Sequence, residues 1–192
     1  MTPAAASGTA GARSGRRRVF FALWPDAVTV DSLDALARSA HAAFSGRRMR
    51  RDTLHMTLAF IGEVDALRIA DLLAAAGRVP LPEAFSMRID QVRCWRHNRI
   101  VWCGPSAMPA QLEALAASLA GALDAVGFRL EARAFAAHAT LLRHADCRRD
   151  APPFDAFDWR VADFVLVESN LTAAGARYSV IGRWPLASMP QR

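Results

Sequence analysis

The sequence predicts a mixed α and β protein that is built from two similar halves. Its 192 residues are 53% hydrophobic, which is enough to bury a substantial core in one domain. Apolar strand-like runs alternate with segments whose apolar residues recur at helical spacing and end near a glycine. The tetrapeptide His-x-Thr-Leu also occurs twice, at residues 55–58 and 138–141. These observations indicate one pattern of elements used twice.

The first half begins with "VFFALW", residues 19–24, an apolar run that predicts a buried strand. Residues 33–44 then carry apolar side chains at helical spacing, which predicts a helix. The run "LHMTLAFIG", residues 54–62, predicts the next strand. A second helix is expected over about residues 64–76.

The second half is expected to repeat this order. Residues 84–95 and 100–104 predict two strands joined by the polar turn "RHNR". The clearest helix of the chain lies between Pro109 and Gly127, and "AAHATLLR", residues 136–143, follows as a strand. Two further strands are expected at residues 159–171 and 177–184. In each half a strand leads to a helix and then to a His-x-Thr-Leu strand, so we infer an internal duplication.

Charge is concentrated at the start of the chain. The net charge is +6, and all 24 basic residues are arginine. Residues 1–17 have little to bury and predict a disordered basic tail, which leaves 18–188 as a single folded domain. The apolar run after the arginines stops at Pro25, too short for an export signal, so we expect a cytoplasmic protein. No apolar run reaches the roughly 18 residues that a membrane-spanning helix needs.

The cysteines indicate no disulfide framework and no zinc knuckle. Cys94, Cys103 and Cys147 form no C-x-x-C pair, and their odd number fits a reducing compartment.

Each His-x-Thr-Leu strand is expected to present one imidazole and one hydroxyl on the same face. Side chains alternate along a strand, so His55 and Thr57 share a face, roughly 6 to 7 Å apart. His138 and Thr140 repeat this arrangement. The opposite face of the first strand carries the expected core residues Leu54, Met56, Leu58 and Phe60. The strand-embedded aromatics Phe20, Trp24, Trp95 and Trp102 are likewise interpreted as core.

The repetition favours a functional interpretation. One His-x-Thr alone would be ordinary for a half-exposed sheet, but a shuffled chain of this composition would hold roughly 0.02 such tetrapeptides, against two observed. A metal site is the first alternative, yet metals normally need three or four protein ligands, and these strands offer no Asp, Glu or Cys. Acid–base chemistry needs only the two imidazoles, one neutral and one protonated, and no cofactor. In-line displacement at a phosphodiester fits two histidines from opposite sides, with the threonines and a nearby arginine meeting the charged oxygens.

Paired His-x-Thr-Leu strands about eighty residues apart, the first continuing as "AFIG", resemble the two-histidine (2H) phosphoesterase superfamily. More closely, "RRRVFFALWPD", "LHMTLAFIGEV", "CWRHNRIVWCGP" and "DFVLVESNLTAAGARYSVIGRWPL" are similar to the RNA 2′,3′-cyclic phosphodiesterases, also called 2′-5′ RNA ligases. The resemblance spans about residues 18–186. It implies a bilobal α+β fold, in which two pseudo-symmetric antiparallel sheets face each other across a central groove with helices on the outer faces.

The resemblance also implies a function and a set of site residues. The family hydrolyses ribose 2′,3′-cyclic phosphates to 2′-phosphates without metal, and some members join or cleave 2′-5′ linked RNA. By position, His55 and His138 are the expected catalytic pair, and Thr57, Thr140 and Arg143 the expected phosphate-binding residues. We expect His138 to activate water and His55 to protonate the leaving 3′ oxygen. The expected partner is RNA or a nucleotide with a 2′,3′-cyclic phosphate, bound by a monomer.

Two departures and two alternatives accompany this reading. Relatives often have Arg-Pro before the second histidine, where this chain has Ala136-Ala137. Arg143 lies an odd number of residues from His138, so strict alternation aims it away from the groove unless the strand ends or bulges there. The alternatives are an RNA-end-binding module with little catalysis, and a 2H phosphodiesterase for another cyclic or 2′-5′ linked nucleotide. The arginine run at 47–51 is a solvated edge or an attractor for RNA.

Overall fold

The larger of two antiparallel sheets holds most of the strands. The computed structural model describes residues 15–131, 134–173 and 175–188. The helices in this part of the chain are α1 (Ala27–Phe44), α2 (Ile69–Ala76) and α3 (Ala110–Asp124), with short 3₁₀ turns at Arg51–Thr53 and Ala66–Arg68. The strands are β1 (Arg16–Leu23), β2 (Arg47–Arg48), β3 (Met56–Asp65), β4 (Phe85–Ile89), β5 (Gln91–Trp95), β6 (Ile100–Gly104), β7 (Ala139–Arg143), β8 (Phe157–Val161), β9 (Asp163–Thr172) and β10 (Gly175–Pro185). The expected α+β class is confirmed.

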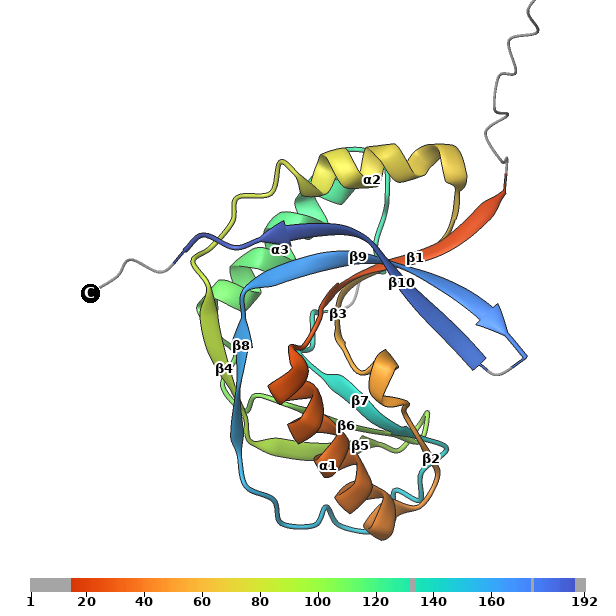
Figure 1. The fold of residues 1–192 in the computed structure, drawn as a ribbon, viewed down its shortest axis with the longest axis vertical. Helices are drawn as coiled ribbons and strands as arrows, with labels where there is room; N and C mark the ends of the chain where they lie inside the picture. Colours follow the sequence, from red (N-terminus) through yellow and green to blue (C-terminus); the bar gives the residue numbers. More distant parts are fainter. Residues whose placement is uncertain (1–14, 132–133, 174, 189–192) are drawn as a thin grey trace, which may run out of the picture.

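The large sheet consists of two parts joined at one point. Its strand order is β10-β9-β1-β3-β7-β6-β5, with β2 added to β7. Strands β3 and β7 pair only through Met56 and Ala139. Figure 1 shows the two parts diverging from this junction, β10-β9-β1-β3 above and β7-β6-β5 below. The two expected half-sheets are therefore present, and a single residue pair connects them.

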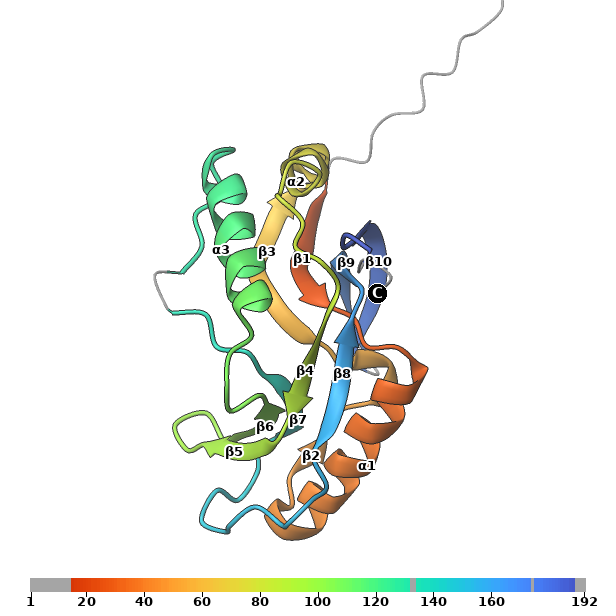
Figure 2. The same ribbon diagram turned by 90° about the vertical axis from the view of Figure 1, so that its left-hand side faces the viewer.

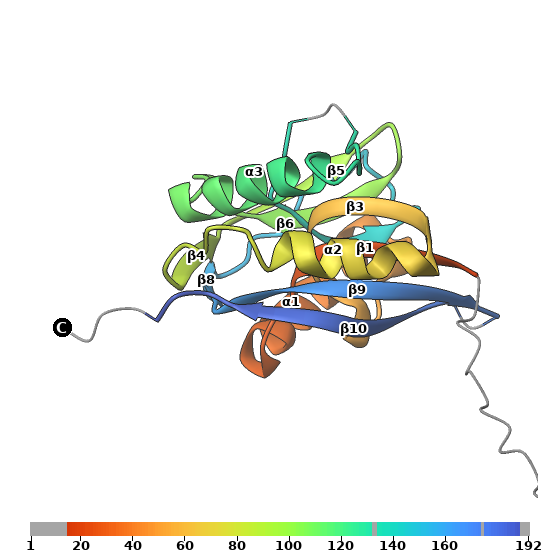
Figure 3. The same cartoon turned by 90° about the horizontal axis from the view of Figure 1, so that it is seen from above.

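The helices interlock the two halves. Helix α1 follows β1 in sequence but packs against β7 and β8, whereas α3 follows β6 and packs against β3. Helices α2 and α3 contact each other and lie side by side in Figure 3. Because each half contributes the helix that covers the other, one continuous apolar core runs through both and includes Phe44, Met56 and Leu112.

The small second sheet corrects one prediction. Residues 84–95 are not one strand, because the chain changes sheets at Asp90, between β4 and β5. Strand β4 pairs with β8, and the two run together in Figure 2, whereas β5 pairs with β6 in the large sheet. The Asp90 carboxylate fixes this change of direction by accepting hydrogen bonds from the Ser106 backbone N–H and hydroxyl.

Two element boundaries also differ from the sequence predictions. Strand β3 continues to Asp65, so the second helix begins at Ile69 rather than near residue 64. Strand β1 begins at Arg16, two residues before the expected start of the domain, because Arg16 and Arg17 pair with the end of β3. Arg17 also forms a bidentate ion pair with Glu168 on β9. Residues 1–14 of the expected tail lie outside the described residues.

The cysteine prediction was wrong for two of the three residues. Cys94 and Cys147 form a disulfide with a Cα–Cα distance of 5.7 Å, within the usual range for such bonds. They are 53 residues apart in sequence, so spacing alone gave no sign of the pair. Cys103 is a free thiol in the core, where burial raises its pKa to about 12. Among the helices of the described residues, none is long and apolar enough to cross a membrane.

Candidate active site

The junction of the two half-sheets brings the two motif histidines together. His55 immediately precedes Met56, and His138 immediately precedes Ala139, and these two following residues form the single β3–β7 pair. In a regular antiparallel pair, residues placed in this way are diagonal neighbours on one face, about 7–8 Å apart. This placement puts the two imidazoles on the same face of the sheet, where both line one cavity.

Both imidazoles are held by the same local contact. The Nδ1 of His55 lies 2.7 Å from the carbonyl oxygen of Thr53, and the Nδ1 of His138 lies 2.8 Å from that of Ala136. A carbonyl oxygen only accepts hydrogen bonds, so Nδ1 carries the proton in each ring. Proton exchange with a ligand therefore falls to Nε2 in both. The residue two before each histidine sets its tautomer, although these residue types differ.

Aromatic rings fix the orientation of both histidines. His55 stacks on Trp24 at a centroid distance of 5.8 Å, and Phe20 and Tyr178 also contact it, at 4.8 and 5.4 Å. His138 lies against Trp95 and Trp102, at 4.5 and 6.2 Å.

The core interpretation of these aromatics is therefore only partly right. Phe20 is buried, yet it and Trp24 belong to a small separate cluster with Val165 and Val167 rather than to the main core. The two tryptophans of the second half are half-buried. All four pack against a motif histidine. A strand pattern predicts burial, but it does not say which buried side chain touches a polar one.

The environment of His55 favours its neutral form. Burial is the main cause that lowers the pKa of His55, to about 4, and the nearby His138 and Arg143 lower it further. The hydrogen bond to Thr53 opposes this effect because it stabilises the protonated ring. His138 lowers the pKa of His55 because the two imidazoles lie close together in one site.

The five predicted site residues line one cavity of about 190 Å³. His55, Thr57, His138, Thr140 and Arg143 all contribute to its wall. The remaining lining residues are Arg18, Phe20, Met49, Thr53, Phe60, Ile100, Ser169 and Tyr178. This histidine cavity thus combines two imidazoles, five hydroxyl groups from Ser, Thr and Tyr, and two guanidinium groups.

A bulge explains how Arg143 reaches this cavity. The register of β6 against β7 shifts between Val101, which faces Leu142, and Trp102, which faces Thr140. Leu141 is the extra residue, and both Leu141 and Leu142 are buried. The alternation of side chains is reset at this point. Arg143 therefore shares the face of Thr140, and the bulge that the sequence analysis required is present.

A similar bulge overturns the prediction for Phe60. Ala22 faces Thr57 and Phe21 faces Ala59, so Leu58 is an extra residue in β3. Beyond it the faces exchange: Ala59 is buried, whereas Phe60 is 48% exposed and lines the histidine cavity. Strict alternation had placed Phe60 in the core. No signal in the run "LHMTLAFIG" marks the bulge.

Three further cavity residues were not predicted as site residues, although all lie in segments that resemble the family. Arg18 lies in β1, at the expected start of the domain, and its guanidinium lies 5.0 Å from the Phe60 ring centroid. Tyr178 on β10 and Ser169 on β9 reach the cavity through strand pairing alone. Tyr178 is the single tyrosine of the chain, which is the one sequence feature that could have drawn attention to it.

A close backbone approach positions the second histidine. A Cβ atom at Gly104, the last residue of β6, would collide with the carbonyl oxygen of Ala137. Glycine is therefore required where β6 passes the segment that enters β7. Gly46 has a similar role at the other end of β7, because a Cβ there would meet the Arg143 carbonyl oxygen at 2.8 Å, and its φ is +87°.

A larger basic groove adjoins the histidine cavity. It has a volume of about 490 Å³ and shares Arg18, Arg143 and Tyr178 with the smaller cavity. Arg47 and Arg50 add two more guanidinium groups to its wall, and Arg50 also pairs with Asp52. Two arginines of the run at 47–51 thus line a groove rather than only a solvated edge.

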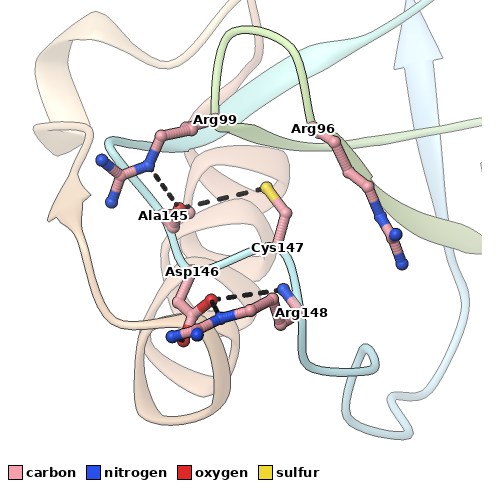
Figure 4. A pocket seen from close by; sticks show the side chains of 6 residues that line it. All are labelled: Arg96, Arg99, Ala145, Asp146, Cys147 and Arg148. Atoms are coloured by element: carbon pink, nitrogen blue, oxygen red, sulfur yellow. Dashed lines mark hydrogen bonds and ion pairs between the residues drawn. The ribbon is translucent and has the colours of Figure 1, made fainter.

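A third cavity, drawn in Figure 4, lies elsewhere. Its volume is also about 490 Å³, and its lining includes Arg96, Arg99 and Cys147. Arg148 there pairs with Asp146, which lowers the pKa of that carboxyl to about 2. None of the predicted site residues belongs to it, and it contains no acid–base pair that could act on a substrate. The histidine cavity is therefore the candidate site despite its smaller size.

The donor set does not favour a metal. Among residues 15–131, 134–173 and 175–188, no group of three or more His, Cys, Asp or Glu side chains is arranged to hold a metal ion. Fold and site together have the form of a two-histidine phosphoesterase, with one imidazole from each half-sheet at a common cavity.

Comparisons with known proteins agree with this class. A family model described as LigT-like phosphoesterase matches residues 23–102. The chain is 33% identical over 172 residues to the RNA 2′,3′-cyclic phosphodiesterase of Escherichia coli, covering 88% of this chain and 97% of that protein. The crystal structures of E. coli LigT in apo form and with 3′-AMP match with TM-scores of 0.77 and 0.78, at 32% and 31% identity. These matches cover 91% and 90% of this chain, and 99% of each LigT chain. The chain belongs to the LigT-like phosphoesterase family.

Proposed function

We propose that this protein hydrolyses 2′,3′-cyclic phosphates of RNA or nucleotides to 2′-phosphates by metal-independent acid–base catalysis. The observation that carries the proposal is the pair of imidazoles, each with Nδ1 bound to a backbone carbonyl, in one cavity with the two motif threonines and two arginines. The 33% identity to an RNA 2′,3′-cyclic phosphodiesterase over most of both chains supports the same substrate class.

In the proposed reaction, His138 acts as the general base and His55 as the general acid. Nε2 of His138 takes a proton from water as the water oxygen bonds to phosphorus. The bond from phosphorus to the 3′ oxygen breaks on the opposite side, and that oxygen takes a proton from Nε2 of His55. The products are a 2′-phosphate and a 3′-hydroxyl, with the second water proton retained by the phosphate. Two histidines on opposite sides of one phosphorus suit this in-line geometry.

The low pKa of His55 adds a condition to this assignment. In the empty site His55 is neutral at pH 7, whereas the acid must carry a proton. An anionic phosphodiester close to the ring favours the charged imidazole and therefore raises its pKa. The substrate thus supplies part of the charge that the acid requires.

Charge on the non-bridging oxygens is assigned to the other predicted residues. The hydroxyls of Thr57 and Thr140 donate hydrogen bonds from the two half-sheets, and the guanidinium of Arg143 supplies positive charge. Arg18, which sequence reasoning did not select, joins this group because it lines the same cavity. One chain supplies both halves of the site, which supports action as a monomer. The cytoplasmic location stays a prediction.

A product assay with a cyclic-phosphate-ended RNA in EDTA tests the proposal. The expected product carries a 2′-phosphate, formed at the same rate with and without the chelator. Loss of activity on chelation would restore the metal-site reading. Binding of the RNA without any turnover would instead favour an RNA-end-binding module.

A further inference from the structure

A second large cavity, which we call the alanine-lined cavity, adjoins the histidine cavity and is distinct from the basic groove. Its volume is about 490 Å³, and it shares Thr57, Phe60 and His138 with the histidine cavity. It shares no lining residue with the basic groove. The histidine cavity shares lining residues with both and therefore connects them. A substrate whose phosphate lies between the histidines can therefore extend into both.

The divergence of the half-sheets accounts for this cavity. Strands β3 and β7 separate after their single pair, so β3 from Thr57 to Phe60 faces the segment that leads into β7. Helix α3 covers the opening, and apart from Glu113 the residues it presents, Ala116, Ala117 and Ala120, are too small to fill it. Beyond the catalytic residues, the wall is mainly apolar, and Phe60 and Met108 on it are 48% and 40% exposed.

Charge distinguishes the occupants of the two neighbouring cavities. The basic groove is lined by four arginines, and no carboxylate lines it within the described residues. The alanine-lined cavity instead carries two carboxylates, Glu113 and Glu131, and no arginine or lysine in its described wall. A phosphate is repelled by the carboxylates, whereas a neutral flat base tolerates them and gains from apolar contact. A volume of this size lies within the range of about 300–1,000 Å³ that small-molecule sites occupy.

We propose that the alanine-lined cavity receives the base of the nucleoside that carries the cyclic phosphate, with Glu113 selecting among bases. This inference rests on the proposed function. A carboxylate accepts hydrogen bonds, and guanine presents two neighbouring N–H donors to it, whereas adenine and cytosine present one amino group. Uracil places carbonyl oxygens on both sides of its single N–H, and these oxygens repel a carboxylate. The expected order is guanosine, then adenosine and cytidine, then uridine.

Steady-state kinetics with the four 2′,3′-cyclic mononucleotides test the proposal. Ala117→Trp fills the cavity from an exposed position of α3, and Ala114→Trp on the same helix is the matched control because Ala114 is exposed but does not line the cavity. Ala117→Trp is expected to raise KM about tenfold for every base and to change kcat by less than about twofold. Ala114→Trp is expected to behave as wild type. Glu113→Gln is expected to remove a preference for guanosine over uridine of about tenfold in kcat/KM.

The outcomes separate this inference from the proposed function. If the wild-type protein turns over the cyclic nucleotides but Ala117→Trp matches Ala114→Trp, the base pocket is refuted and the proposed function stands. Persistence of the guanosine preference in Glu113→Gln refutes the role of Glu113. An effect of Ala117→Trp confined to dinucleotides places a neighbouring base in the cavity and contradicts the proposal. Failure of the wild-type protein to hydrolyse both the four mononucleotides and a cyclic-phosphate-ended RNA refutes the proposed function itself.

Discussion

The two halves of the molecule hold their histidines in the same way but surround them differently. In both, Nδ1 binds the carbonyl oxygen of the residue two positions earlier. His55 then lies among Phe20, Trp24 and Tyr178, whereas His138 lies against the two tryptophans of β5 and β6. A duplicated backbone contact therefore sets the tautomer of both rings, while burial among its ring neighbours favours the neutral form of His55.

The halves also differ in how their histidine strands are held. Strand β3 is a central strand of ten residues, paired with β1 along most of its length. Strand β7 has five residues, and its position depends on close contacts with Gly46 and Gly104. The first histidine is therefore fixed by a long sheet, and the second by a few tight backbone approaches. The following experiments perturb one half at a time.

Removal of either histidine is expected to have the largest effect. His55→Ala and His138→Ala should each lower kcat by about 100- to 10,000-fold, because each removes one proton transfer. The two losses separate when the substrate is a phosphodiester with a nitrophenol leaving group, which departs without a proton. His55→Ala is then expected to recover most of its activity, and His138→Ala is not. Recovery of His138→Ala instead would reverse the two roles.

A methyl group at Gly104 is expected to produce the next largest effect. Gly104→Ala places a Cβ against the Ala137 carbonyl oxygen and displaces His138, and a displacement of about 1 Å can cost about 100-fold in rate. The measurement is kcat on a cyclic mononucleotide. The control is Gly121→Ala in α3, where no neighbouring atom lies within 4 Å of the added Cβ. Equal activity in the two variants would show that Gly104 does not position the histidine.

The titration of His55 should follow its ring neighbours. Trp24→Ala exposes one face of the imidazole to water, so the pKa of His55 is expected to rise from about 4 toward the ordinary value of 6.5. NMR titration of the ring protons measures this shift. Trp95→Ala, the matched change in the other half, is expected to leave the titration of His55 where it was. A pKa of His55 near 6.5 in the wild-type protein would contradict the burial argument.

The same lowered pKa makes stability depend on pH. As the pH falls through 6.5 the unfolded chain takes up a proton on His55, whereas the folded chain does so only near pH 4. The free energy of unfolding should therefore decrease as the pH falls from 6.5 to 4. The decrease is expected to be at most about 3 kcal/mol, and it is smaller than this limit because the ring is partly exposed. Urea denaturation of wild type and His55→Asn across this range isolates the contribution. Identical pH slopes for the two would exclude it.

The smallest effect is expected in the basic groove. Arg47→Gln removes one groove guanidinium far from the reacting bonds, so hydrolysis of a mononucleotide should not change. Binding of a cyclic-phosphate-ended RNA should weaken, and the slope of log K against log salt should decrease by about 1. Arg48→Gln is the control, because Arg48 is its neighbour in β2 and lines none of the described cavities. An unchanged salt slope in Arg47→Gln would remove the groove from RNA binding.

Sequence patterns could predict the helices, the strands and the duplicated motif. They could not predict where the alternation of side chains along a strand is interrupted. Periodicity located the three helices and most strands, and the doubled His-x-Thr-Leu motif located His55, Thr57, His138 and Thr140. Two bulges, at Leu58 and Leu141, changed which side chains face the cavity. A bulge adds one residue to a strand and has no mark in the residue types. The face of Phe60 was therefore predicted wrongly, and the face of Arg143 could not be predicted.

Residues brought in by long-range pairing were likewise beyond sequence reasoning. Tyr178 and Ser169 reach the cavity because β9 pairs with β1 and β10 with β9, and Cys94 meets Cys147 only after β5, β6 and β7 assemble. None of these contacts is local in sequence. Arg18 was missed for a different reason, since it continues an arginine run that composition assigns to a solvated tail.

A crystal structure with a bound 2′-nucleotide product is the most direct test of whether both histidines act at one phosphate site. We expect the phosphate in the cavity between the half-sheets, with Nε2 of His138 about 2.6–3.2 Å from an oxygen of the 2′-phosphate and Nε2 of His55 at a similar distance from the 3′ hydroxyl oxygen. A phosphate seated in the basic groove or in the cavity of Figure 4, or a product that contacts only one of the two histidines, would contradict the proposed site.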